Sequence, residues 1–388
     1  MNKLNRVLSY ILVAVASVAV TMGVMLSIFL PKLQTPQGMT KLDVVEQLLL
    51  DRFIGEADRD ALEDAAADAM VVALGDRWSY YIPADEYAAY LEDMKNAYVG
   101  VGVTVTMTED ASGLDVTQVT EDGPAEEAGV LAGDKIVGVD GQSVAGMELA
   151  DIKKLILGEA GTTVKLTILR EDAQLELEIT RREIRTIAAK GQMLEGNVGL
   201  VTISNFNSNC ANETIAAIES LQKQGAEKLI FDVRNNPGGY AHELVDVLDY
   251  LLPEGKLFTR VDYTGAEYTD MSDANYLDMP MAVLVNGNSY SAAEFFAAAL
   301  SEYDAAVVVG EKTTGKGYYQ TAIPLSDGSA INLSIGKYYT PKGVSLAETG
   351  VTPDVPVAVD DATAAGIYAG TLAPMEDPQI LAAIDALN

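Results

Sequence analysis

The stretch Met281-Ala-Val-Leu-Val-Asn-Gly-Asn-Ser-Tyr-Ser291-Ala-Ala-Glu294 passes from an apolar run to a polar turn and then to a helix-forming segment. The apolar run predicts a buried strand, and the Asn-Gly-Asn after it predicts a tight turn. Ser291 then opens a predicted helix that ends at Glu302, ahead of another apolar run at Ala306–Gly310. A strand, a turn and a helix in this order are typical of layered α/β domains.

The region from residue 190 to residue 360 repeats this alternation. Apolar runs predict strands at Val198–Ile203 and Lys228–Val233, and helical periodicity predicts helices at Ala211–Gln224 and Gly239–Leu252. Strands that alternate with helices predict a layered α/β domain.

Composition excludes several classes of protein. A chain of 388 residues has room for two or three domains. Its 49% hydrophobic residues are enough to build buried cores. The net charge of −31 argues against binding nucleic acid, whose phosphates need clustered Lys and Arg. The single cysteine, Cys210, excludes an internal disulfide, and a buried structural thiol is favoured over a reactive one.

Ser291 and Lys316 are the main catalytic candidates. A serine hydroxyl becomes a good nucleophile only when a base takes its proton. The chain has one histidine, His242, so a lysine is the favoured base, and Lys316 follows Ser291 by 25 residues. The pKa of free lysine is about 10.4, so Lys316 can act as a base only if a dry pocket lowers its pKa. The glycines on either side of Lys316 would let its stem enter such a pocket.

Backbone amides near Ser291 could stabilise an oxyanion. The Ala292 N–H lies at a predicted helix N-terminus, where N–H groups are unpaired. A second donor could come from Gly238 or Gly239, in the segment Asp232-Val-Arg-Asn-Asn-Pro-Gly-Gly239. Two alternatives stay open. Ser289 or Ser291 could be only an N-cap, and the double-glycine turn could bind a phosphate, although no G-x-G-x-x-G or P-loop lysine pattern is present.

Taken together, these segments resemble the C-terminal processing proteases, also called tail-specific proteases. The resemblance covers residues from about 42 to about 358. It rests on Arg234-Asn-Asn-Pro-Gly-Gly239, Val285-Asn with Ser-Tyr-Ser291-Ala-Ala-Glu294, Gly310-x-x-Thr-x-Gly-Lys316-Gly, Gln320, Tyr339-Thr-Pro-Lys-Gly343 and Gly350-Val-Thr-Pro-Asp354.

The resemblance implies a serine–lysine dyad, in which Ser291 attacks, Lys316 is the base and Gln320 orients the lysine. It also implies an oxyanion hole from the amides of Ala292 and of Gly239 or Gly238. The implied fold is a crotonase- or ClpP-like catalytic core, which we expect at residues 184–360, without a metal or organic cofactor. The chain departs from the family at Tyr290 and Ala293, where Ala and Ser are frequent. A Ser–His pair with His242 is a weaker alternative.

Residues 97–183 change to short β-rich runs with glycine turns, and they resemble an inserted PDZ domain. Val99, Gly100, Val101, Gly102 and Val103 match its carboxylate-binding loop. Successive amides of such a turn can hold a terminal carboxylate while the peptide adds as a strand. A helix with Leu149, Ile152 and Leu155 would form the groove wall. The alternative is a structural β module without a binding role.

The N-terminal segment predicts a membrane anchor. Residues 7–31 carry no charge, and about 20 apolar residues span a bilayer as a helix. We expect an uncleaved signal-anchor with residues 1–6 as a cytoplasmic tip and the catalytic domain outside the cytoplasm; a cleaved signal peptide is the alternative. Residues 41–95 predict an apolar helical arm, which could pack on the rest of the chain or form a homodimer. Residues 361–388 predict a helical tail.

The sequence therefore predicts a membrane-anchored serine endopeptidase that cuts proteins near free, apolar, unfolded C-termini, with the PDZ domain recognising the tail and gating the site. One alternative is an anchored PDZ scaffold whose protease fold is inactive. Another is a signal-peptidase-like Ser–Lys enzyme, which would need neither a PDZ domain nor the double-glycine turn.

Overall fold

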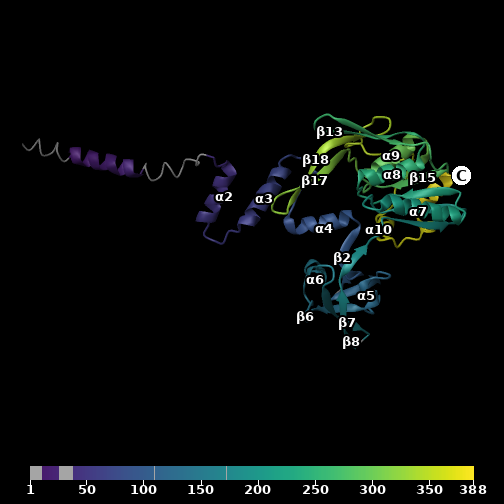
Figure 1. Cartoon of the computed structure of the whole chain (residues 1–388), viewed down its shortest axis with the longest axis horizontal. Helices are drawn as coiled ribbons and strands as arrows, with labels where there is room; N and C mark the ends of the chain where they lie inside the picture. The colour runs from purple at the N-terminus through teal and green to yellow at the C-terminus, as the bar shows by residue number, and fades with distance from the viewer. Residues whose placement is uncertain (1–10, 26–37, 109, 172) are drawn as a thin grey trace, which may run out of the picture. The chain divides into compact units, whose positions relative to one another are not determined.

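The computed structural model describes residues 11–25, 38–108, 110–171 and 173–388, and the chain divides into two compact units, Met1–Tyr81 and Ile82–Asn388 (Figure 1). In the first unit, residues 11–25 are helical, and helices α2 (Lys41–Arg52) and α3 (Arg59–Val72) follow. The membrane segment predicted at 7–31 lies partly outside the described residues. Within those residues, no helix combines the length and the apolar character needed to cross a bilayer.

The arm predicted at 41–95 is not one continuous helix. After α3, Gly75 adopts φ +70°, a conformation that favours glycine and ends a helix. A short strand, β1 (Tyr80–Ile82), comes next, and helix α4 (Ala84–Met94) begins after Pro83. The apolar periodicity thus predicted the helices of the arm, and Gly75 and Pro83 separate α3 from α4.

The β-rich region from residue 97 forms a module with its own core. Its sheet has the strand order β3-β4-β5-β7-β8, with β6 beside β5, and neighbouring strands are antiparallel. Helix α6 buries Ile152 and Ile156 against this core. The elements are β3 (Val103–Met107), β4 (Leu114–Val119), α5 (Pro124–Glu127), β5 (Lys135–Val139), β6 (Gln142–Ser143), α6 (Leu149–Ile156), β7 (Thr163–Arg170) and β8 (Ala173–Thr180). The strands β2 (Ala97–Gly100) and β9 (Arg182–Arg185) pair where the chain enters and leaves the module.

The second half of the chain contains a six-stranded sheet of order β10-β11-β12-β15-β16-β19. All neighbouring pairs are parallel except β10 with β11. The strands are β10 (Ala189–Leu194), β11 (Val198–Ile203), β12 (Lys228–Asp232), β15 (Met281–Val285), β16 (Ala306–Gly310) and β19 (Val355–Pro356). The predicted alternation of strands and helices is present, and the structure shows that it builds a mostly parallel sheet.

Both faces of this sheet are buried, which explains why its central strands read as continuous apolar runs. Side chains alternate along a strand. In β15, Met281, Val283 and Val285 join the core formed with helices α7 (Cys210–Lys223), α8 (Ala241–Leu251) and α9 (Ala292–Glu302). Ala282 and Leu284 face the other way, into a smaller core with Ile380 and Ala383 of helix α11 (Pro378–Ala386). Figure 1 shows α7, α8 and α9 close to β15.

An antiparallel sheet adjoins α9. Strand β13 (Gly255–Asp262) pairs with β14 (Glu267–Ser272) and with β18 (Ala330–Tyr339), which also pairs with β17 (Tyr318–Pro324). The predicted tail at 361–388 is two helices, α10 (Asp361–Ala369) and α11, with a turn of 3-10 helix at Pro374–Glu376 between them. Gly370, with φ +65°, ends α10, and Pro374 and Pro378 begin the two elements that follow.

Candidate active site

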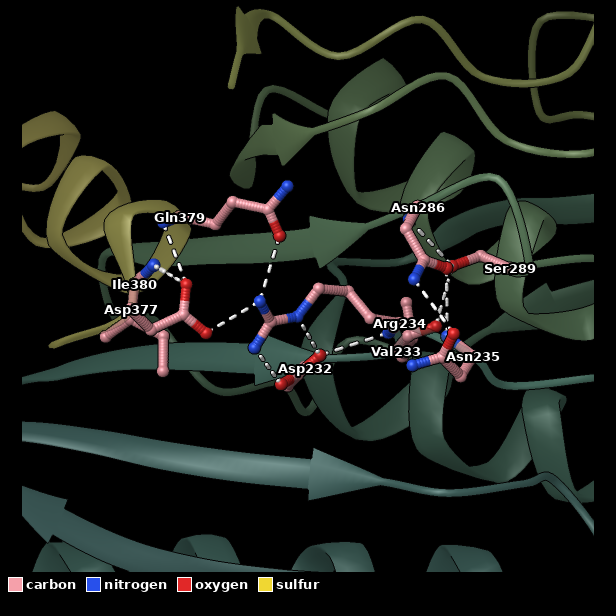
Figure 2. Close-up of polar contacts among 9 residues, drawn as sticks. All are labelled: Asp232, Val233, Arg234, Asn235, Asn286, Ser289, Asp377, Gln379 and Ile380. Carbon is pink, nitrogen blue, oxygen red and sulfur yellow. Dashed lines mark hydrogen bonds and ion pairs between the residues drawn. The ribbon is translucent and has the colours of Figure 1, made fainter. Parts of the chain in front are cut away.

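Three polar loops leave the parallel sheet at the same edge. β12, β15 and β16 are neighbours and parallel, so their carboxyl ends lie together, where α/β sheets usually place their sites. The Asn235 N–H donates to the Asn286 side-chain oxygen at 2.9 Å, and the Asn286 amide donates to the Asn235 oxygen at 3.0 Å (Figure 2). The Thr314 hydroxyl donates to the Gly287 carbonyl at 2.6 Å. These bonds join the loops that carry the predicted glycines, serine and lysine.

The two serines of the β15–α9 loop have different surroundings. Ser289 is fully buried, donates its hydroxyl to the Val233 carbonyl at 2.8 Å and accepts from the Asn286 N–H at 3.0 Å. Ser291 is half-buried at the N-terminus of α9, with φ 59° and ψ −123°. Few non-glycine residues adopt such a conformation, and strain of this kind concentrates at functional sites. The Ser289 hydroxyl therefore serves the turn, while Ser291 remains the candidate nucleophile.

The double-glycine turn lies against Ser291. A Cβ at Gly238, where φ is +94°, would lie 2.8 Å from the Ser291 Cβ and 2.9 Å from the Ala292 nitrogen. The Gly238 N–H donates to the Asn236 side-chain oxygen at 2.8 Å. No acceptor for the Gly239 N–H is found among the described residues. Of the two predicted glycine donors, Gly239 is therefore the better candidate beside Ala292.

Lys316 lies in the loop after β16, between two glycines that other residues could not replace. Gly315 has φ +87°, and a Cβ at Gly317 would fall 2.4 Å from the Ala347 nitrogen. The Lys316 ammonium nitrogen lies 5.6 Å from the ring centroid of Tyr290. Burial raises the pKa of the Tyr290 phenol, which therefore stays neutral at physiological pH. The tyrosine at which this chain departs from the family thus forms one wall around the lysine.

Gln320, the predicted orienting residue, is in β17. Its side-chain nitrogen donates to the Ser334 hydroxyl of β18 at 2.9 Å. This bond fixes the direction of the amide and leaves the side-chain oxygen as the group that could accept from an amine. Gln320 is therefore compatible with the orienting role, through that oxygen.

The motif analysis assigned no role to Glu294, yet this side chain connects two of the loops. Its carboxylate is fully buried. One oxygen, Oε2, accepts from the N–H groups of Ser291 at 3.0 Å and Lys316 at 2.7 Å. The other, Oε1, accepts from the Thr313 hydroxyl at 2.5 Å and the Gly315 N–H at 2.7 Å. Burial raises the pKa of the Glu294 carboxyl, and these hydrogen bonds oppose the rise.

Arg234 anchors the start of the glycine turn through a network shown in Figure 2. Its guanidinium pairs with Asp232 at 2.6 Å and with Asp377, just before α11, at 2.7 Å, and it donates to the Gln379 oxygen at 2.9 Å. The Arg234 side chain is only 4% exposed. Burial alone would lower the pKa of Arg234, but Asp232 and Asp377 raise it above its ordinary value. The sequence motif at residues 234–239 includes Arg234, but no local sequence pattern predicted its distant partners Asp377 and Gln379.

A cavity of about 510 Å³ marks the groove of the β module. Four of the five residues predicted as the carboxylate loop line it, and the fifth, Gly100, does not. Val99 and Gly100 both belong to β2, where Gly100 pairs with Arg182. The loop residues that line it are Val99, Val101, Gly102 and Val103. Ile156 and Leu157, at the end of α6, lie on another wall. Because β3 is the edge strand of its sheet, an extended peptide could add beside it.

Other candidates are not brought into this site. The exposed His242 packs against Tyr240 with the two rings tilted by 30°, and its Nε2 lies 3.8 Å from the Glu243 Oε1. Cys210 is fully buried, as predicted, and burial raises the pKa of its thiol to about 12. In the described part of the chain, no three His, Cys, Asp or Glu side chains gather as a metal site would require.

Comparison with known proteins identifies the family. Residues 197–357 match the model of peptidase family S41, and residues 116–170 match the model of a PDZ domain. A probable CtpA-like serine protease of Staphylococcus haemolyticus is 33% identical over 352 residues, covering 90% of this chain and 70% of that protein. The chain belongs to peptidase family S41, among the CtpA-like serine proteases. This confirms the family that the motifs resembled, together with a PDZ domain.

Further relatives agree. A probable CtpA-like serine protease of Staphylococcus epidermidis is 33% identical over 83% of this chain and 66% of its own length. This chain thus spans about two thirds of the length of these relatives. A putative S41 protease from Bacteroides fragilis has a similar solved structure, with a TM-score of 0.56 and 16% identity over 91% of this chain and 99% of that one. A photosystem II D1 C-terminal processing protease is 32% identical over 82% and 87% of the two chains, with a TM-score of 0.48.

Proposed function

We propose that this chain is a serine endopeptidase with a Ser291–Lys316 dyad, which cleaves proteins near free, apolar, unfolded C-termini. The observation that carries the proposal is the convergence of three loops at one sheet edge, with Ser291 strained at the start of α9 and Gly238 against it. Family membership supports the same chemistry. We also propose that the catalytic core is crotonase- or ClpP-like.

The reaction would follow the usual course of an acyl-enzyme mechanism. Neutral Lys316 takes the proton of Ser291 as the hydroxyl oxygen attacks the substrate carbonyl. Addition places negative charge on the former carbonyl oxygen of the substrate, and the amides of Ala292 and Gly239 would stabilise that charge. The intermediate collapses, and the protonated lysine gives its proton to the leaving amine. Water, with its proton taken by Lys316, then releases the acyl group.

The PDZ groove would recognise the substrate tail and gate the site. Its apolar wall at Ile156 and Leu157 suits apolar side chains, and its glycine-containing loop suits a terminal carboxylate. We propose membrane attachment through residues 7–31 and an extracytoplasmic catalytic domain. Homodimer formation through the arm remains a prediction; in α2, no side chain is buried, which leaves its apolar residues open to a partner.

The test is cleavage by the full chain of a disordered protein that ends in apolar residues, followed by mass spectrometry. Ser291→Ala and Lys316→Ala should abolish cleavage. Lys312→Ala is the matched control, because the Lys312 side chain is exposed in the same loop, and this variant should cleave normally. Normal turnover by Lys316→Ala would reject the dyad.

A second comparison tests tail recognition. A substrate with an amidated C-terminus should be cut more slowly than the free acid, because the loop loses its carboxylate ligand. Equal rates would remove the PDZ groove from recognition. If neither the parent nor any variant cleaves while all are folded, the inactive PDZ scaffold becomes the better interpretation.

A further inference from the structure

The buried carboxylate of Glu294 bonds to both halves of the proposed dyad, and the mechanism above gives it no part. One oxygen, Oε2, accepts from the main-chain N–H groups of Ser291 and Lys316, which belong to different loops. We propose that Glu294 is a positioning residue, which holds these two main chains in a fixed relation so that nucleophile and base stay within reach. This inference rests on the proposed Ser–Lys chemistry.

The bonding pattern requires a carboxylate. An ionised carboxylate offers about four lone-pair positions, and the four donors around Glu294 occupy both oxygens, two on each. A glutamine would present an NH₂ group to two of these donors and leave them without an acceptor. Hydrogen bonds to an ionised group are also roughly twice as strong as neutral ones. Glutamine therefore has nearly the same shape as glutamate but cannot accept all four hydrogen bonds.

The two segments that Glu294 holds are ones that would otherwise relax. Ser291 has φ 59°, a strained conformation that persists only where the surrounding structure imposes it. Lys316 lies between two glycines, whose main chain is the least restricted. Removing the shared acceptor should let both move, and with them the reacting groups.

A second side chain extends the support. The Thr313 hydroxyl donates to Glu294 and accepts from the Val351 N–H at 2.7 Å. Val351 belongs to the Gly350-Val-Thr-Pro-Asp354 motif, which the catalytic mechanism leaves unexplained. That motif thus also holds the lysine loop, through Thr313.

The experiment compares Glu294→Gln with the parent, each normalised by titration of active serines with a fluorophosphonate. The kcat per titrated site should fall about 10²-fold, because a displacement of roughly 1 Å costs about that much. KM should change little. The acid limb of the kcat–pH profile, which reports deprotonation of Lys316, should move to higher pH as the lysine leaves its pocket.

Glu213→Gln is the matched control. Glu213 accepts from the Ala188 and Ala189 N–H groups at 2.6 and 3.1 Å, so its amide variant loses comparable bonds outside the site. It should lower the fraction of titratable sites without changing kcat per site or the pH profile. A purely structural Glu294 would behave in the same way, and that result would overturn the inference.

If Glu294→Gln does not fold, two substitutions of Thr313 test the same inference. Thr313→Ser keeps the hydroxyl and should retain kcat per site, whereas the isosteric Thr313→Val should lower it with the same pH shift. Equal kcat in both variants would overturn the inference. The proposed function fails separately, and only if Ser291→Ala or Lys316→Ala still cleaves.

Discussion

Gly238→Ala tests the closeness of the glycine turn to Ser291, the proposed nucleophile. The added Cβ would lie 2.8 Å from the Ser291 Cβ and 3.1 Å from its hydroxyl oxygen. Two carbon atoms in favourable contact are about 3.5–4.0 Å apart, so the variant must open the gap by about 0.7 Å or more. Side-chain rotation cannot relieve the contact between the two Cβ atoms, because each is bonded directly to the main chain.

Two costs add in this variant. A positive φ costs alanine about 1–2 kcal/mol, and overpacking costs about 1–3 kcal/mol more. If Ser291 moves by most of the 0.7 Å, kcat should fall by about 10²-fold, which equals about 2.7 kcal/mol of activation free energy. We therefore expect a loss of about 2–5 kcal/mol in stability together with a specific loss of turnover.

The assay measures kcat, KM and urea unfolding in parallel with Gly225→Ala. Gly225 has φ +97°, close to that of Gly238, but its Cβ would meet nothing within 4 Å. Gly225→Ala should therefore show the backbone cost of about 1–2 kcal/mol alone and keep kcat unchanged. Equal kcat in the two folded variants would refute the argument, because the position of Ser291 would then not depend on Gly238.

Three further predictions concern buried groups. Burial raises the pKa of Cys210 to about 12, so iodoacetamide at pH 8 should alkylate it only after unfolding; rapid alkylation of the native chain would contradict this. Arg234→Met leaves Asp232 and Asp377 without their counter-ion. Breaking a buried ion pair costs about 3–5 kcal/mol, so urea unfolding should show a loss of that size in the free energy of unfolding. A loss below about 1 kcal/mol would contradict the importance of the network. The hydrogen bond from Arg170 holds the pKa of Asp134 below its usual range. This pair therefore stabilises the fold above about pH 4, which is the pKa of the carboxyl in the unfolded chain. The contribution is lost as pH falls through the lower pKa of the folded state. Asp134→Asn should have a lower Tm than the parent at pH 7, and its Tm should fall less on acidification.

Local patterns were enough to predict the central strands and the loops that follow them. Met281–Val285 and Ala306–Gly310 coincide with β15 and β16, because strands buried on both faces are continuous apolar runs. The polar motifs follow these runs directly, and because the strands are parallel neighbours, their carboxyl ends bring the motifs together. The arm was predicted less well, since the range 41–95 was expected to be helical and contains the short strand β1.

The supporting residues were harder to predict from the sequence. Glu294 was visible only as a member of a motif, and its four donors come from two loops that meet in three dimensions. The partners of Arg234 include Gln379, 145 positions away, and nothing in the local sequence connects them. The choice of Ser291 over Ser289 required family spacing, whereas the buried bonds of Ser289 give an independent reason.

The ion pair between Arg234 and Asp377 also sets an order of assembly. A ribosome adds about 5–20 residues per second, so the 145 positions from Arg234 to Gln379 take about 7–30 seconds to synthesise. During that interval the arginine has only its local partner, Asp232. The glycine turn therefore gains its second counter-ion, Asp377, only after Ser291 and Lys316 have both been synthesised.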